Sequence, residues 1–214
     1  MKSIHSEKGN ITIVTLASMG GMIVMFLIIF SMANAFLVKG KATNSAEQAS
    51  IAASAEMYKA INEAIDEYDA QLTLDDLLAE TLRDKIQDRK QSIMRPISDS
   101  EKERIAINDV LSSELSVLNL QLSPILRNKM TGALTNAQQA ARDVILANGG
   151  ETLNGKIIFF NSNHQIEVHA SARYEAFFMD SLIDESSRNI SDEGYGPKLS
   201  FLEKLSWSVQ ERNF

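Results

Sequence analysis

Residues 11–38 read ITIVTLASMGGMIVMFLIIFSMANAFLV, and this stretch decides the architecture of the chain. It contains no Asp, Glu, Lys, Arg or His. A helix that crosses a bilayer needs about 20 predominantly apolar residues, so this stretch is long enough to span one. The rest of the 214-residue chain is polar and patterned like a folded domain. We therefore expect a segment over residues 1–10, a transmembrane helix over 11–38 and a domain over 39–214.

The charges that flank this stretch bias its orientation only weakly. Lys2 and Lys8 precede it and Lys39 and Lys41 follow it, so the Lys and Arg counts on the two sides nearly tie. The segment before the span is too short to hold a domain, and the domain after it is acidic. We predict a single-pass protein of the cell membrane or of a surface filament, with its N-terminus cytoplasmic and its domain outside. A cleaved signal peptide is the alternative, since residues 33–35 fit the small-x-small cleavage pattern.

The helix is expected to continue beyond the span to about residue 68. No Pro interrupts residues 11–94, and alanine, the best helix former, recurs there at helical spacing. Within the span, two small residues lie four apart, and such pairs let membrane helices approach closely. We predict a stripe that packs against neighbouring helices, with members Ala17, Gly21, Ala42, Ala46, Ala49 and Ala53. The alternative is a helix that packs on its own domain, and both arrangements could hold at different heights.

The middle of the chain predicts three more helices. Thr73 is expected to cap the first, which ends before Pro96. A second helix opens near Asp99. A third begins at Ser123-Pro124, with Pro at its first position, and stops at the Asn-Gly-Gly of residues 148–150.

The C-terminal third changes to the period of a β-strand. Apolar and polar residues alternate over residues 165–178, which predicts a half-buried strand. Residues 156–160 predict an earlier strand, joined to it by a hairpin turn at 161–164. Residues 204–210 alternate and predict a third strand, whereas residues 180–197 are interpreted as a loop. The expected fold class is α+β, with a long N-terminal helix, a helical middle region and a small antiparallel sheet.

The sequence carries no recognisable catalytic or metal-binding pattern. Its three histidines, His5, His164 and His169, are interpreted as solvated. No P-loop, GxGxxG, GxSxG or HExxH pattern occurs, and the absence of Cys removes thiolate chemistry. The net charge of −7 argues against nucleic acid, because phosphate binding needs a basic patch. We expect a non-enzymatic protein without a cofactor, metal or small-molecule substrate.

Three short features frame the apolar stretch. Glu7-Lys8-Gly9 precedes it, Lys39-Gly40-Lys41 follows it, and residues 46–53 read AEQASIAA. With the span, they make residues 1–57 resemble the TadE/TadG type of Tad/Flp pilus-assembly proteins. Those proteins carry a Glu-Arg/Lys-Gly leader, a long span, a charged pair and a small-residue segment. The resemblance implies a pseudopilin, a minor pilin or an assembly protein whose partners are other pilus or assembly-machine subunits.

The resemblance also implies a prepilin-type cleavage between Gly9 and Asn10. In prepilins a Glu stands five residues beyond the cut, and here that position holds Val14. A charge within a span seeks a partner, so the absence of this Glu counts against both processing and polymerisation, and it agrees with the TadG-like branch. The expected function is that of a structural component of a Tad-like type IV pilus or related secretion system. The alternative is a membrane-anchored sensor or adhesion domain that does not enter a filament.

Overall fold

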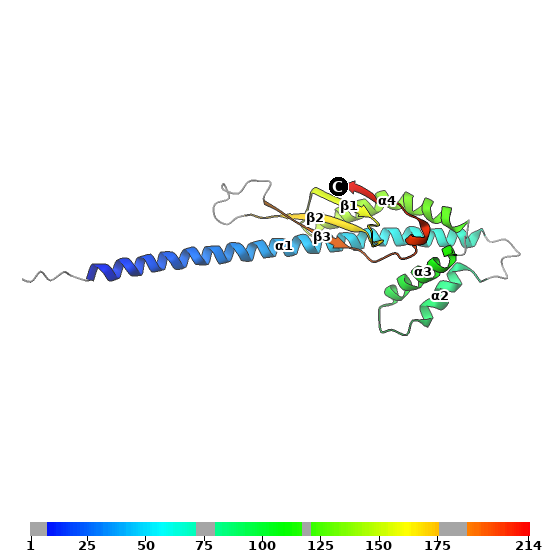
Figure 1. The fold of residues 1–214 in the computed structure, drawn as a ribbon, viewed down its shortest axis with the longest axis horizontal. Helices are drawn as coiled ribbons and strands as arrows, with labels where there is room; N and C mark the ends of the chain where they lie inside the picture. Colours follow the sequence, from blue (N-terminus) through cyan, green and yellow to red (C-terminus); the bar gives the residue numbers. More distant parts are fainter. Residues whose placement is uncertain (1–7, 72–79, 117–120, 176–187) are drawn as a thin grey trace, which may run out of the picture.

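The computed structural model describes residues 8–71, 80–116, 121–175 and 188–214. The fold is α+β, as predicted, with a long apolar N-terminal helix, further helices and a small antiparallel sheet (Figure 1). The elements in chain order are α1 (Lys8–Ala70), α2 (Leu82–Ser92), α3 (Asp99–Ser116), α4 (Leu122–Ala147), β1 (Glu151–Phe159), β2 (Glu167–Arg173), β3 (Asn189–Tyr195), α5 (Leu202–Leu205) and β4 (Gln210–Asn213). We call the described residues from 39 onward the head.

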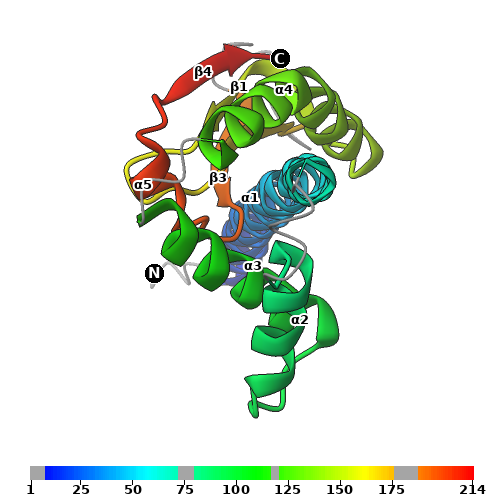
Figure 2. The same ribbon diagram turned by 90° about the vertical axis from the view of Figure 1, so that its right-hand side faces the viewer.

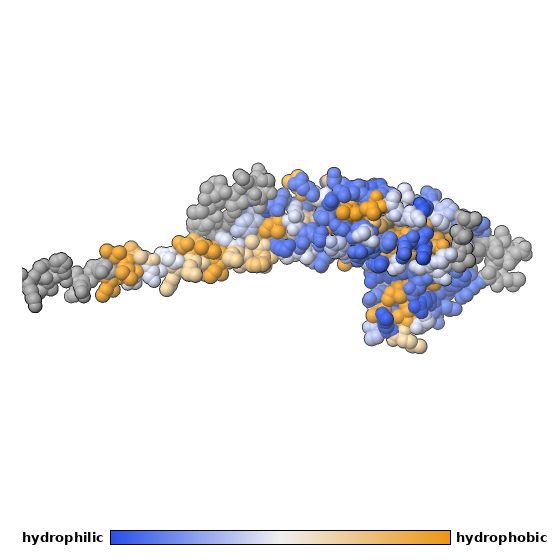
Figure 3. All heavy atoms as spheres, viewed as in Figure 1, coloured by the Kyte–Doolittle hydropathy of each residue, from blue (hydrophilic) through white to orange (hydrophobic). Residues whose placement is uncertain are grey.

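α1 is one helix of 63 residues, which confirms the prediction that it continues unbroken beyond the apolar stretch. At 1.5 Å per residue it is about 95 Å long. Its N-terminal part extends from the head as a bare apolar rod, whereas the face of the head that Figure 3 shows is mostly hydrophilic. Its C-terminal part lies inside the head, with α4 and the sheet on one side and the α2–α3 hairpin on the other (Figure 2).

The sheet has the strand order β3-β2-β1-β4, and every neighbouring pair is antiparallel. Its inner face buries Val168 and Ala170 of β2 and Ile157 and Phe159 of β1. This face covers α1, through β2 and β3, and α4, through β1. The hydrophobic core therefore lies between the sheet and the α1–α4 pair, and it includes the fully buried Met130 of α4.

α4 buries one apolar stripe, with members Leu122, Leu126, Met130, Leu134, Ala137, Ala141 and Ile145. Its C-terminus is the predicted one. Gly149 adopts the left-handed conformation with φ of +68°, and the Gly150 N–H donates to the Ile145 carbonyl at 2.8 Å. Its N-terminus is corrected, because the helix begins at Leu122 and Pro124 is not its first residue. Pro124 is still within the first turn, where backbone N–H groups have no helical acceptor.

The α2–α3 hairpin projects from the side of α1 (Figure 1). The cap of α2 is Thr81, whose hydroxyl accepts from the Asp84 N–H at 3.1 Å. Asp69 of α1 also accepts from the N–H groups of Leu82 and Arg83, at 2.9 and 3.0 Å. The predicted cap Thr73 lies outside the described residues. A carboxylate of another helix therefore accepts from the first two free N–H groups of α2. A local sequence motif does not reveal such a partner.

The hairpin turn at residues 161–164 is confirmed. The Asn161 side-chain oxygen accepts from the N–H groups of Asn163 and Gln165, at 2.9 and 3.2 Å, and His164 has φ of +59°. The strand predicted over 165–178 is shorter, because β2 ends at Arg173 and residues 176–178 lie outside the described part.

Two other predictions for this region are wrong. Residues 189–195, interpreted as loop, form β3 at one edge of the sheet. Residues 204–210 do not form a strand, because α5 ends at Leu205 and β4 begins only at Gln210. Leu199, Leu202 and Leu205 are buried at a spacing of three, so helical packing overrides the apparent alternation.

Candidate functional site

The apolar part of α1 is uncovered. Every side chain over residues 11–30 is exposed, apart from the half-buried Leu27. Within the described residues, α1 is the one helix long and apolar enough to cross a membrane. Burying such a surface in lipid is strongly favourable, at roughly 25 cal/mol for each Å² of apolar area.

The small residues Ala17 and Gly21 lie in this uncovered part. Both are exposed, and a Cβ added to Gly21 meets nothing within 4 Å. Small residues of this kind allow a second helix to approach closely. Helix packing is the role that we propose for this pair below. Gly9 and Asn10, the implied cleavage position, lie in the first turn of α1.

The alanine stripe of the second half of α1 has different surroundings. Ala42, Ala46, Ala49 and Ala53 are each 0% exposed. They face the chain's own β3, β2 and α4, which are the elements packed on α1. Of the two arrangements considered for this stripe, packing on its own domain is the one present. A neighbouring helix has no access to these four residues in this conformation.

Two glycines of the C-terminal region allow this close packing. A Cβ on Gly194 of β3 would lie 2.2 Å from the Ala46 carbonyl carbon and 2.2 Å from the Glu47 nitrogen. A Cβ on Gly196 would lie 2.2 Å from the Ser54 hydroxyl oxygen. β3 therefore rests directly on the backbone of α1, and the small residues on the two elements form one interface. The sequence shows the small residues of both elements, but its pattern around the two glycines indicates a loop and not a strand that packs on α1.

A polar cluster fixes β3 on α1 at the end of this interface that is nearer the apolar part of α1. Asp192 of β3 accepts a short hydrogen bond from the Thr43 hydroxyl, and the Lys39 ammonium lies 3.3 Å from its carboxylate. The Thr43 hydrogen bond holds the pKa of Asp192 below its usual range, against the opposing effect of partial burial, and Lys39 adds to it. We call Lys39, Thr43 and Asp192 the β3 clamp.

The clamp predicts a pH dependence. The folded-state pKa of Asp192 lies below its unfolded value of about 3.9, so its stabilisation is fully present above that pH and is lost as the pH falls through the lowered pKa. Asp192→Asn should lower the free energy of unfolding by about 1 kcal/mol at neutral pH. The difference from wild type should shrink towards zero as the pH falls through the lowered pKa of Asp192. Chemical unfolding in detergent at a series of pH values measures this.

Asp88→Asn is the matched control, because Asp88 is exposed on α2, away from the clamp. It should change the free energy of unfolding by less than about 0.5 kcal/mol at every pH. A pH-independent deficit in Asp192→Asn would instead assign the effect to lost packing.

A second polar cluster lies on the outer face of the sheet. The ligand atoms of Glu167, His169 and Glu193 lie within 4.8 Å of one another, so these residues could hold a metal ion. Hydrogen bonds within the protein also account for the arrangement. The Asn161 amide donates to Glu167 at 2.9 Å, and His169 Nε2 lies 2.6 Å from the other Glu167 oxygen. Burial acts to raise the pKa of Glu167, but the hydrogen bonds from Asn161 and His169 outweigh it and hold that pKa below its usual range.

This cluster corrects the interpretation of His169 as a solvated side chain, since it is half-buried and paired with Glu167. Its third member, Glu193, accepts a hydrogen bond from Tyr195 that raises the pKa of that phenol to about 12. His164 lies in the hairpin turn, and His5 lies outside the described residues. In the described part of the chain, the side-chain partner of His169 is the Glu167 carboxylate, so this contact defines no nucleophile–base pair.

An apolar hollow of about 350 Å³ lies between α1 and α3 and is lined by Ile51, Tyr58 and Ile107 among others. Tyr58 accepts a hydrogen bond from Asn108 at 3.0 Å, and burial raises its pKa. These groups hold α3 on α1, which is a structural role.

These features define a class of protein: a single apolar helix that is continuous with an α+β head, with no catalytic arrangement among the described contacts. Residues 9–56 match the model of the family described as Flp pilus-assembly TadE/G-like. The match covers the uncovered part of α1 and the first turns under β3, the same region that carried the resemblance in the sequence. No curated protein and no solved structure matches the chain. The match supports a pilus-related membrane component with a structural role.

Proposed function

We propose that the chain is a structural component of a Tad-like type IV pilus or related secretion system, acting as a minor pilin, pseudopilin or assembly protein. In this proposal residues 1–10 are cytoplasmic, the apolar part of α1 lies in the membrane and the head is outside. Its partners are other pilus or assembly-machine subunits, which it contacts through the uncovered part of α1. It uses no cofactor and performs no catalysis.

The division of α1 carries this proposal. One half of the helix is covered on its small-residue side by the chain's own head, and the other half is bare, apolar and continuous with it. A bare apolar helix needs either lipid or other helices around it. The same plan, a long N-terminal helix with an antiparallel sheet on its second half, resembles that of pilins.

Cell fractionation combined with intact mass tests the proposal. We expect the chain in the membrane or sheared-surface fraction, with protease removing the head from intact cells or protoplasts. A mass reduced by residues 1–9 would show cleavage after Gly9. A full-mass chain in the soluble fraction, or a head protected until lysis, would contradict the proposed anchoring and orientation respectively.

The uncovered small-residue pair gives a prediction about assembly. Ala17→Cys or Gly21→Cys should form cross-links to neighbouring pilus-system helices in cells that express the whole system, because small residues allow close approach. Gly21→Leu should weaken capture through Ala17→Cys, since added bulk at such a contact costs about 1–3 kcal/mol. Immunoblotting of the cross-linked species measures both effects.

Met19→Cys is the matched control, since Met19 is exposed and lies on roughly the opposite side of the helix, two residues from Ala17. Equal capture from positions 17 and 19 would mean that the pair has no specific role.

The burial of the alanine stripe favours a second candidate, an anchored sensor or adhesion domain that does not enter a filament. In that case the head of the same chain already covers the alanine stripe of α1, and the bare half of the helix is surrounded by lipid alone. No capture from positions 17 and 21, together with a strictly membrane-bound monomer, would favour this candidate.

A further inference from the structure

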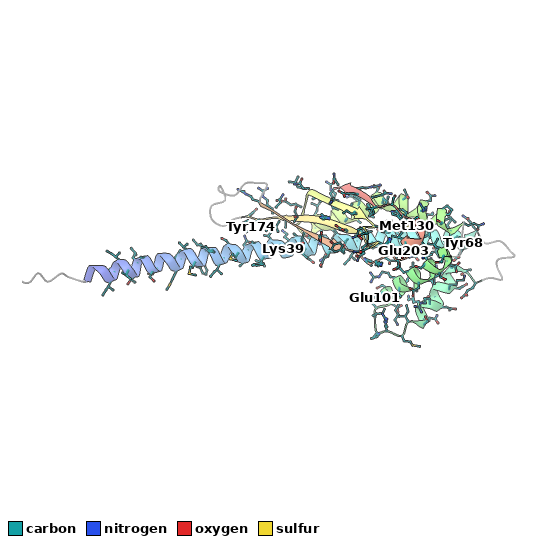
Figure 4. The ribbon with its side chains drawn as sticks, in the orientation of Figure 1. Lys39, Tyr68, Glu101, Met130, Tyr174 and Glu203 are labelled. Atoms are coloured by element: carbon teal, nitrogen blue, oxygen red, sulfur yellow. The ribbon has the colours of Figure 1, made fainter. Side chains whose placement is uncertain are left out.

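The head begins to contact α1 inside the apolar stretch, before that stretch ends at residue 38. The Tyr174 hydroxyl donates to the Ser31 carbonyl at 3.4 Å, and the Asn34 amide donates to the Glu175 carbonyl at 2.9 Å. Tyr174 lies at the end of the head nearest the bare helix, further towards it than Lys39 (Figure 4). The last two turns of the apolar stretch therefore lie beside the head.

The groups at this level are incompatible with hydrocarbon. Arg173 and Glu175 are charged and exposed, and they line an open hollow with Asn34 and Val38 of α1. Charged side chains are costly in the bilayer core, and lipid-exposed backbone outside helices and closed sheets does not occur there. Residues 174–175 are outside any helix or strand. The hydrocarbon must therefore end on the N-terminal side of Ser31.

The length that remains fits a bilayer. Residues 11–30 form 20 residues of helix, which at 1.5 Å each are about 30 Å long, the thickness of a typical hydrocarbon core. Apart from the half-buried Leu27, these are also residues whose side chains are exposed.

The head cannot slide along the helix to free residues 31–38 without breaking its own packing. The β3 clamp joins Asp192 to Lys39 and Thr43. One step further along, Gly194 rests on the backbone of Ala46. The Lys41 side chain also packs against Gly149 at the C-terminus of α4, close enough that a Cβ there would lie 2.7 Å from its ammonium.

Resting on the proposed membrane anchoring, we infer that the hydrocarbon boundary lies at about residue 30. Residues 31–35 of α1 and residues 173–175 of the head then form a surface that sits in the headgroup layer of the bilayer. The phospholipid headgroups are its partner. Lys39 and Lys41 lie about 14 and 16 Å along the helix from Phe30, beyond a headgroup layer of about 5–8 Å. Their role is to hold the head and not to bind lipid.

Cysteine labelling in proteoliposomes tests this boundary, because the chain has no Cys of its own. The variants are Met22→Cys, Phe26→Cys, Ala33→Cys, Leu37→Cys and, in the head, Asn44→Cys. A membrane-impermeant maleimide is loaded on both sides of the vesicles, and the labelling rate of each variant is measured. A thiol in hydrocarbon does not react, because the polar reagent stays out and the reactive thiolate cannot form there.

The key comparison is matched for exposure. Phe26 is 66% and Leu37 74% exposed, so a difference between them reports the bilayer and not the protein. We expect positions 33 and 37 to label at the rate of position 44, and positions 22 and 26 to remain unlabelled.

Two other outcomes separate the inference from the proposed function. Protection of 33 and 37 to the same degree as 26 would overturn the boundary at residue 30 while leaving the span intact. Labelling of all five positions at one rate would show that α1 does not enter the bilayer, and both the anchoring and this inference would fail.

Discussion

Val168→Asp is expected to abolish the folded head. Val168 is 0% exposed on the inner face of β2, between Ile157 of β1 and Gly194 of β3. The substitution removes an apolar side chain from the core and buries a carboxylate with no partner. Removing an ion from water costs several kcal/mol even after relaxation, on top of about 1.5–3 kcal/mol for the lost burial of Val. A total loss above about 4 kcal/mol is a large fraction of the usual 5–15 kcal/mol of a domain.

The pH dependence of this variant identifies the cause. A buried carboxyl favours its neutral form, so its folded-state pKa would be raised. The destabilisation should therefore be smallest at low pH and grow as the pH rises above the unfolded value of about 3.9. Ser191→Asp places the same carboxylate at an exposed position on the outer face of β3 and should change the free energy of unfolding by less than about 0.5 kcal/mol. Limited proteolysis and chemical unfolding measure both, and equal loss in the two variants would refute the assigned faces of the sheet.

Gly194→Ala is the second large effect that we expect. The added methyl group would lie 2.2 Å from two backbone atoms of α1, which cannot rotate away as a side chain can. β3 must then move off the helix, which also separates the β3 clamp. Overpacking of a core typically costs about 1–3 kcal/mol, and a collision with backbone places this variant at the top of that range or above. Thermal unfolding of the full chain in detergent should show a melting temperature lower by roughly 6–12 °C.

Two other glycines make a graded control. At Gly196 the nearest atom is the Ser54 hydroxyl oxygen, which can rotate, so Gly196→Ala should cost less than Gly194→Ala. Gly132 is exposed in α4 with nothing within 4 Å of an added Cβ, so Gly132→Ala should stabilise the helix by about 1 kcal/mol. Any other order of the three variants would mean that β3 does not rest on the backbone of α1.

Much of the fold follows from local pattern. The apolar run, the absence of Pro and the recurring Ala predict α1 to within two residues of its end at Ala70. The alternation around Val168 and the turn at Asn161 predict the central hairpin, because one buried face imposes a period of two. The prediction of a strand over residues 204–210 was wrong. The buried leucines of this region follow a helical spacing, but over too few residues to be distinguished from the alternation of a strand.

β3 was missed for a specific physical reason. Its inward positions hold Ile190, Asp192 and Gly194, so the face that packs on α1 is not an apolar stripe. Gly194 is there because the backbones touch, and Asp192 because Thr43 and Lys39 lie opposite it. Both Gly194 and Asp192 are therefore explained by contacts with residues about 150 positions away in the sequence, and not by their neighbours in the chain.

The sequence by itself determined that α1 is one long helix, that residues 11–38 are apolar enough for a membrane and that small residues line one side of it. These three properties follow from the composition and the periodicity of the segment itself, and they do not depend on the rest of the chain. Only the tertiary structure decided what covers the small residues, because a stripe of Ala selects for close approach without selecting the partner. It also decided where the bare helix ends, since Tyr174 and Glu175 reach Ser31 and Asn34 through a sheet whose position is set by β3 resting on Ala46.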